Sequence, residues 1–264
     1  MHTRLSEEDL AFQREVRQFL QESWDQELAA TCNNRATMKP GAVEWQQRLY
    51  RKGWMAPHWP VQYGGTDWTV TQSFIYSSER AAAGAPEAVA FGVTMVASVI
   101  IAYGNDEQKA RYLPALATGE KIAAYALTEG NSGSDARAAR TRATLSQDAS
   151  HYVLNGAKQF ITNAGIADVF VAYAKVDGDK FTAFLVDKGS AGLSLGGEEA
   201  KLGISGASTR SVVFEDAKVP AENVLFEVGQ GHVVAFNALN IGRLKLAAQC
   251  VGAAKAALAH AAKY

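Results

Sequence analysis

The segment from Thr128 to Asp135 contains the residue types that could bind an anion. It follows a strand-like run that includes Tyr125 and Leu127, and small residues dominate it. Successive backbone N–H groups with little side-chain obstruction can form a nest for a phosphate, and Thr128 and Ser134 add hydroxyl donors. The spacing is not GxGxxG, and the loop taken alone is more typical of a polar turn between strands.

The acidic and histidine residues show no catalytic or metal-binding pattern. Glu129, inside the loop, is interpreted as a structural acceptor rather than a general base. Five further glutamates lie in turn-like stretches and are expected to be solvated: Glu198, Glu199, Glu215, Glu222 and Glu227. The five histidines show no ligand spacing: His2, His58, His151, His232 and His260. No metal site is therefore expected, and Ser134 has no histidine at a motif spacing that would suggest a hydrolase.

Helices precede the loop and must help to position it. Ser6, followed by three acidic residues, is an N-cap with favourable charge in the first turn. A second pattern over 43–52 stops at Gly53, which can take the left-handed conformation that ends a helix. Further helices are predicted over 71–83, 88–103 and 106–117.

Two stretches of this helical part allow more than one interpretation. Trp54, Trp59 and Tyr63 could form a ligand platform, but core packing of a helix-to-helix loop is at least as well supported. The seventeen uncharged residues from Ala88 to Gly104 approach the ~20 of a membrane span. They include small and polar residues and lack a Lys/Arg asymmetry that would orient a span, so we expect a central buried helix and no membrane span.

From Gly119 onwards, short alternating runs separated by turn signals indicate a change from helix to sheet. The strongest local signal is Asn155-Gly156 between two apolar runs, which predicts a type I′ hairpin. Further strands are predicted over 168–176, 181–186 and 208–214, the first two joined by the turn Asp177-Gly178-Asp179.

The sequence from Gly231 to Tyr264 is helical again and rich in Ala and Gly, which permits close packing against a second helix. No capping residue or Pro ends the pattern, so we expect the first long helix of a bundle whose other helices are missing from this chain. Together the elements predict a multi-domain α+β chain. It has an all-α domain over 1–120, an antiparallel β-barrel or sandwich domain over 121–229, and the long helix over 230–264.

The composition excludes several classes of protein. The 264 residues include 26 Lys plus Arg and 27 Asp plus Glu, so the net charge of −1 does not favour nucleic acid or an anionic membrane as a partner. Cys32 and Cys250 are far apart and form no CxxC, which argues against a disulfide scaffold and favours a reducing compartment. Charged residues such as Arg4 and Glu7 interrupt the N-terminus before any apolar leader could form, so the expected location is the cytoplasm.

Several short motifs accompany the loop at characteristic distances. They are Val153 to Lys158, Phe160-Ile161-Thr162, Lys201 to Ile204, Ser208-Thr209-Arg210, Phe214-Glu215-Asp216 with Val219-Pro220, and Asn240 to Arg243. In combination with the loop from Thr128 to Asp135, they closely resemble the acyl-CoA dehydrogenase family of flavoproteins. The resemblance covers essentially the whole chain. It implies an N-terminal helical domain, a middle β domain and the first helix of an incomplete four-helix bundle.

The resemblance implies that FAD lies against two groups of residues. These are Tyr125, Leu127, Thr128, Gly133 and Ser134 on the strand and loop, and Phe160, Ile161 and Thr162 after the second apolar run. It also implies that acyl-CoA lies near Ser134, Asn240 and Arg243. The chain departs from the family pattern where the family commonly has Pro at Gly130, often Asp at Asn240 and more often Trp at Phe160.

The implied activity is the oxidation of a saturated acyl-CoA thioester to the trans-2-enoyl-CoA. A glutamate removes the α proton while FAD accepts the β hydrogen as hydride. In the family this base lies mostly in the C-terminal helical domain, and in a minority at the position of Gly242, so we expect it after Tyr264.

A second hypothesis is a non-catalytic relative that binds flavin or acyl-CoA, or that docks a partner. A third is a flavin oxidase. Expected partners are an electron-transferring flavoprotein or a similar acceptor, and further copies of the chain in a homo-oligomer.

Overall fold

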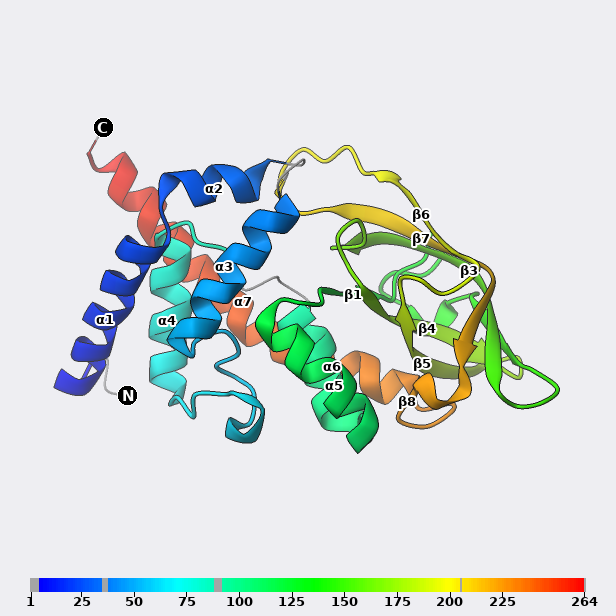
Figure 1. Cartoon of the computed structure of the whole chain (residues 1–264). Helices are drawn as coiled ribbons and strands as arrows, with labels where there is room; N and C mark the ends of the chain where they lie inside the picture. Colours follow the sequence, from blue (N-terminus) through cyan, green and yellow to red (C-terminus); the bar gives the residue numbers. More distant parts are fainter. Residues whose placement is uncertain (1–4, 35–37, 88–91, 205, 264) are drawn as a thin grey trace. The chain divides into compact units, whose positions relative to one another are not determined.

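The computed structural model describes residues 5–34, 38–87, 92–204 and 206–263, and of residues 240–245 it describes the backbone alone. Two compact units make up the chain (Figure 1): residues 1–90 with 240–264, and residues 91–239. Helices form the first unit and a sheet dominates the second, which confirms the predicted α+β class. The predicted domain limits of 1–120, 121–229 and 230–264 stay predictions.

The N-terminal part of the first unit contains α1 (Glu7–Ser23), α2 (Gln26–Asn33), α3 (Met38–Lys52) and α4 (Val70–Ala82). Ser6 caps α1 as predicted, because its hydroxyl accepts from Asp9 N at 3.1 Å and its own N–H donates to Asp9 Oδ2 at 3.2 Å. Gly53 follows α3 with a φ of 77°. Apolar periodicity does not predict α2. Its N-cap is Asp25, whose carboxylate accepts from Leu28 N at 2.7 Å.

Aromatic side chains form the centre of this unit. The Trp54 ring is 7% exposed and packs against four other aromatic rings. These are Phe12, Phe19, Trp68 and Tyr76, with ring centroids 5.1 to 5.9 Å from that of Trp54. Trp59 is also buried. Both tryptophans therefore serve core packing, the second of the two interpretations of this loop.

The second unit begins with helical segments that lead into the sheet. A π-helical turn (Gly92–Val96) continues as α5 (Ala97–Tyr103), and α6 (Asp106–Thr118) follows. The predicted helix over 88–103 is observed from residue 92, and residues 88–91 lie outside the described part. Val93, Val96, Val99 and Ile100 are all buried, as expected of a central helix. Among the described residues, no helix is long and apolar enough to cross a membrane.

The sheet has eight strands. They are β1 (Ala123–Ala126), β2 (Arg142–Leu145), β3 (His151–Thr162), β4 (Val169–Val176), β5 (Lys180–Asp187), β6 (Leu193–Glu198), β7 (Thr209–Pro220) and β8 (Val224–Leu225). Their order is β6-β7-β3-β2-β4-β5-β8, and β1 also pairs with β4. Because β1 and β2 both run parallel to β4, the sheet is mixed and open rather than an antiparallel barrel. Turn signals predict only pairs of consecutive strands, so these parallel pairings between distant segments escaped the sequence analysis.

The predicted hairpin at Asn155-Gly156 is wrong, because both residues lie inside the single strand β3. A register shift between Leu154 and Gly156 marks a β-bulge there, and Gly156 has a φ of 148°. A Cβ at Gly156 would stand 2.6 Å from Thr141 Oγ1, so glycine is required by a close approach of two segments. The second predicted hairpin is confirmed: β4 and β5 are joined at Asp177-Gly178, with φ values of 48° and 94°.

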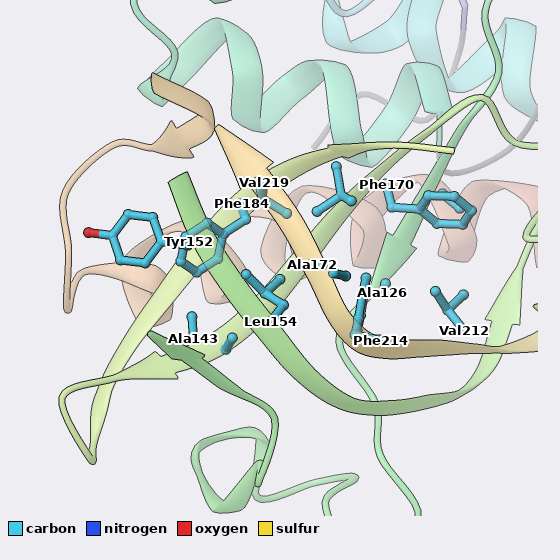
Figure 2. Packing of buried hydrophobic residues seen from close by; sticks show 14 of the residues in the cluster. Ala126, Ala143, Tyr152, Leu154, Phe170, Ala172, Phe184, Val212, Phe214 and Val219 are labelled. Carbon is cyan, nitrogen blue, oxygen red and sulfur yellow. The ribbon is translucent and has the colours of Figure 1, made fainter. Parts of the chain in front are cut away.

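Buried apolar side chains of the sheet pack together in a cluster (Figure 2). Phe170 and Phe184 are completely buried, and Phe214 is 1% exposed. Phe184 packs edge to face on Tyr152 with ring centroids 5.1 Å apart. Every residue of β4 except Lys175 is buried, so both of its faces are covered. This core fixes the strands whose ends carry the candidate site.

The last element is α7 (Gly231–Ala261), which contributes to both units. In the sheet unit its Val234, Ala235 and Ala238 are buried. In the helical unit a Cβ at Gly252 would collide with the carbonyl of Ser78 on α4. The small residues of this helix therefore permit close packing against a second helix, as the sequence predicts.

Candidate functional site

The loop after β1 is a closed turn held by its own backbone. Glu129 N donates to the Ser132 carbonyl at 2.9 Å, and Ser132 N donates to the Glu129 carbonyl at 3.1 Å. The Ser132 hydroxyl, which is buried, donates to the Asp135 carbonyl at 2.7 Å. These three bonds close the segment into a turn.

Donors on this loop remain available to a ligand. Within the part of the chain that the structure describes, the backbone N–H groups of Thr128, Gly133 and Ser134 have no hydrogen-bond acceptor. Gly133 and Ser134 are exposed, and no atom lies within 4 Å of the place where a Cβ of Gly133 would stand. Unpaired amides at exposed small residues are what an anion nest requires.

The carboxylate of Glu129 is buried and connects the loop to neighbouring segments. Glu129 is 5% exposed and accepts from Lys158 Nζ at 2.6 Å and from Thr141 Oγ1 at 2.6 Å. Its carboxylate also accepts from the backbone N–H groups of Arg140 at 2.6 Å and Thr141 at 3.1 Å. Burial opposes ionisation, but the Lys158 charge and these bonds together lower the pKa of Glu129. Glu129 is therefore an ionised structural acceptor, as the sequence analysis interprets it.

The end of β3 lies beside the loop, because Gln159 N donates to the Thr128 carbonyl at 2.9 Å. A second register shift, between Lys158 and Ile161, interrupts the pairing of β3 with β7. Within it, Phe160 has a φ of 58° and a ring that is 57% exposed. Bulges of this kind re-aim side chains, and here the bulge turns an aromatic ring out of the core. Thr128 and Phe160, which the sequence analysis assigns to one cofactor, are thus on adjoining segments.

Other predicted cofactor residues are oriented differently. Ile161 belongs to the apolar cluster at 2% exposure, and Leu127 is also buried. The Tyr125 hydroxyl accepts from Tyr173 at 2.7 Å and donates to the Ala235 carbonyl at 3.2 Å. Burial raises the pKa of Tyr125, so its phenol is neutral. These three side chains are therefore committed to the core.

The predicted substrate residues are only partly described. Ser134 is exposed on the loop. The side chains of Asn240 and Arg243 lie outside the described part of the chain. Among the described residues, no group of three or more His, Cys, Asp or Glu could hold a metal ion.

Two polar clusters near the site were not anticipated. The motifs do not mark Lys158 as a site residue. It follows the same alternation along β3 as the buried Tyr152 and Leu154, and that alternation is the signal that could identify it as buried. Glu198 was expected to be solvated, and this is wrong.

The Glu198 carboxylate accepts from Ser208 Oγ at 2.6 Å, Thr209 N at 2.9 Å and Arg210 Nε at 2.7 Å. Burial opposes the effect, but these three bonds lower its pKa. Because Thr162 pairs with Thr209, this cluster holds the strand opposite the third residue of the Phe160 motif.

Two family models match this architecture. The acyl-CoA dehydrogenase N-terminal domain matches residues 6–120, and the acyl-CoA dehydrogenase middle domain matches residues 124–217. The chain belongs to the acyl-CoA dehydrogenase family. The middle-domain match includes the nest, the buried Glu129 and the bulge at Phe160.

Curated relatives agree with this membership. A probable acyl-CoA dehydrogenase of Bacillus subtilis is 49% identical over 227 residues, covering 84% of this chain and 38% of the relative. The short-chain specific acyl-CoA dehydrogenase of Clostridium acetobutylicum is 38% identical over 255 residues, covering 94% of this chain and 67% of the relative. An acyl-CoA dehydrogenase of Bacillus anthracis, solved in complex with FAD, is 42% identical with a TM-score of 0.87. It is matched over 98% of this chain and 45% of its own length. The chain thus spans less than half the length of two of these three proteins.

Proposed function

We propose that this chain forms the flavin-binding and acyl-CoA-binding site of an acyl-CoA dehydrogenase. The reaction is the oxidation of a saturated acyl-CoA thioester to the trans-2-enoyl-CoA. The observation that carries the proposal is the open nest of Thr128, Gly133 and Ser134 beside the exposed ring of Phe160. Unpaired amides suit the polar and anionic parts of a dinucleotide, and an uncovered aromatic ring suits the apolar edge of its ring system.

FAD is the cofactor that these residues fit. FAD bound there would supply the chemistry of hydride acceptance from the β carbon of the thioester. Thr128 and Ser134 would donate to it from the loop, while Phe160 and Thr162 would border it from the end of β3. Tyr125, Leu127 and Ile161, whose side chains are buried, would support the segments that hold it. The relative from Bacillus anthracis, whose complex with FAD is solved, supports this assignment.

The residues of this chain position the cofactor and the substrate, and none of them is assigned the transfer of the α proton. Glu129 is not the base that removes the α proton, because its carboxylate accepts four hydrogen bonds and is 5% exposed. The base expected after Tyr264 stays a prediction. We place acyl-CoA beside Ser134, with Asn240 and Arg243 as further substrate contacts, and we take an electron-transferring flavoprotein as acceptor and a homo-oligomer as the working state.

A second candidate is a protein that binds flavin or acyl-CoA without dehydrogenating it. Two features favour it: Glu129 is fully engaged, and position 242, where a minority of the family has the base, is glycine. The two candidates share the cofactor site and differ in turnover.

The test is a titration of the purified chain with FAD, followed by flavin absorbance and by the melting temperature. Binding that is weakened by Ser134→Val and by Phe160→Ala, and not by the exposed control Leu145→Ala, supports the site. Absence of any response at high micromolar FAD contradicts it. Reduction of an artificial electron acceptor by butyryl-CoA or octanoyl-CoA in the same sample favours the dehydrogenase, and binding without reduction favours the second candidate.

A further inference from the structure

The Glu129–Lys158 ion pair is more completely buried than the other ion pairs of the described residues. The side chain of Lys158 is 0% exposed and that of Glu129 is 4% exposed, with 2.6 Å between Nζ and Oε1. Removing two charges from water is unfavourable, and apolar residues of similar volume are often as stable or more stable in their place. Stability alone is therefore a poor explanation for this pair, and its contacts suggest another.

The pair joins three segments that are distant in the chain. Lys158 belongs to β3, and Glu129 lies in the loop from Thr128 to Asp135. The remaining donors to Glu129 come from Arg140 and Thr141, directly before β2. Lys158 Nζ also lies 3.4 Å from the carbonyl of Leu127, which it donates to. The ammonium group of Lys158 thus binds the backbone carbonyl of the residue before Thr128 and the side chain of the residue after it.

This clamp determines how Thr128 is presented. With Leu127 O and the Glu129 carboxylate both turned toward Lys158, and the Thr128 carbonyl bound by Gln159 N, the Thr128 N–H is left without an acceptor. The reciprocal bonds between Glu129 and Ser132 then direct the chain toward Gly133. The buried pair and these backbone bonds together hold the loop in the conformation that leaves the amides of Thr128, Gly133 and Ser134 unpaired.

We infer that Glu129 and Lys158 are positioning residues for the cofactor, holding residues 127–134 in the binding conformation before FAD arrives. This inference rests on the proposed function for its ligand. If the loop samples other conformations when the clamp is removed, the apparent affinity falls in proportion to the competent fraction. A competent fraction of about one tenth raises the Kd for FAD about ten-fold.

The test uses the charge-free double variant Glu129→Gln with Lys158→Met, which leaves no unpaired charge in the core. Lys180→Met is the matched control, because Lys180 is also a strand lysine in an ion pair but its side chain is 54% exposed. For each protein we would measure the FAD Kd, the melting temperature, and amide hydrogen exchange of residues 127–134 without FAD.

A positioning role predicts a Kd raised about ten-fold and faster exchange of the loop at a nearly unchanged melting temperature, with the control within about two-fold. A folded double variant with the Kd and loop exchange of the original chain overturns the inference. If the double variant does not fold, Thr141→Val provides the test, because it removes one hydrogen-bond donor to Glu129. It should accelerate hydrogen exchange of residues 127–134, and unchanged exchange refutes the positioning role. If the original chain binds no FAD, the proposed function fails, while loop exchange still decides whether the pair holds the loop.

Discussion

The close approach of β3 to the segment before β2 can be tested by Gly156→Ala. A Cβ at this position would stand 2.6 Å from Thr141 Oγ1, 2.8 Å from its Cα and 2.9 Å from its Cβ. The backbone φ of 148° is also unfavourable for any residue with a side chain. Backbone strain of about 1 to 3 kcal/mol and overpacking of about 1 to 3 kcal/mol together predict that the free energy of unfolding falls by about 2 to 6 kcal/mol.

Two control variants separate these contributions. Gly178→Ala has a positive φ of 94° but no atom within 4 Å of the new Cβ, so it should show the backbone contribution alone. Gly189→Ala has neither feature and should change stability by about 0.5 kcal/mol or less. A Gly156→Ala variant no less stable than Gly178→Ala would refute the close approach, and with it the position of Thr141 behind Glu129.

The assay must report on the sheet rather than on the helices. All five tryptophans, from Trp24 to Trp68, belong to the helical unit, so tryptophan fluorescence does not follow the sheet. Hydrogen exchange of the β3 amides gives the free energy of opening of the sheet directly. The same samples should show whether displacement of Thr141 also accelerates exchange in the nest.

Three further outcomes are expected. Ser6→Ala removes the cap of α1 and should destabilise the helical unit by about 0.5 to 2 kcal/mol in urea unfolding followed by tryptophan fluorescence, and no change would contradict the capping contact. Phe170→Ala leaves a cavity at a completely buried position and should lower the free energy of unfolding by about 3 to 5 kcal/mol, measured by hydrogen exchange of the β4 amides. A decrease of less than about 1 kcal/mol would contradict the packing in Figure 2. The pKa of Glu198 is lower in the folded protein than its unfolded value of 4.5, so its contribution to stability is present above pH 4.5 and is lost as the pH falls through the folded pKa. Glu198→Gln should therefore reduce the loss of stability at acidic pH in a plot of unfolding free energy against pH. An unchanged plot would argue against the cluster.

Local signals predicted those elements whose conformation depends on neighbouring residues. The cap at Ser6, the end of the third helix at Gly53 and the turn at Asp177-Gly178 each depend on a few adjacent positions, and each is observed. The Asn155-Gly156 pair carries an equally strong local signal but lies within a strand. There, pairing with β2 and β7 and the approach of Thr141 override the preference for a turn.

The candidate site also contains residues that local sequence indicates and residues whose roles depend on distant partners. The unpaired amides at Gly133 and Ser134 are a property of a loop of small residues, so the sequence can indicate them, and the binding of an anion there stays a prediction. The roles of Lys158 and Glu198 depend on partners 29 and 10 to 12 residues away, which the strand pairing brings together. No periodicity shows such partners, so an inward-facing lysine and a turn-like glutamate could not be assigned from the residues alone.

The most direct test of the account is a comparison of amide hydrogen exchange with and without FAD across the whole chain. Protection confined to two segments, residues 128–134 and 159–162, is the predicted result, because those segments carry the free donors and the exposed ring. Protection elsewhere with no change in these two segments, at a FAD concentration that alters the flavin spectrum, would contradict the proposed cofactor site.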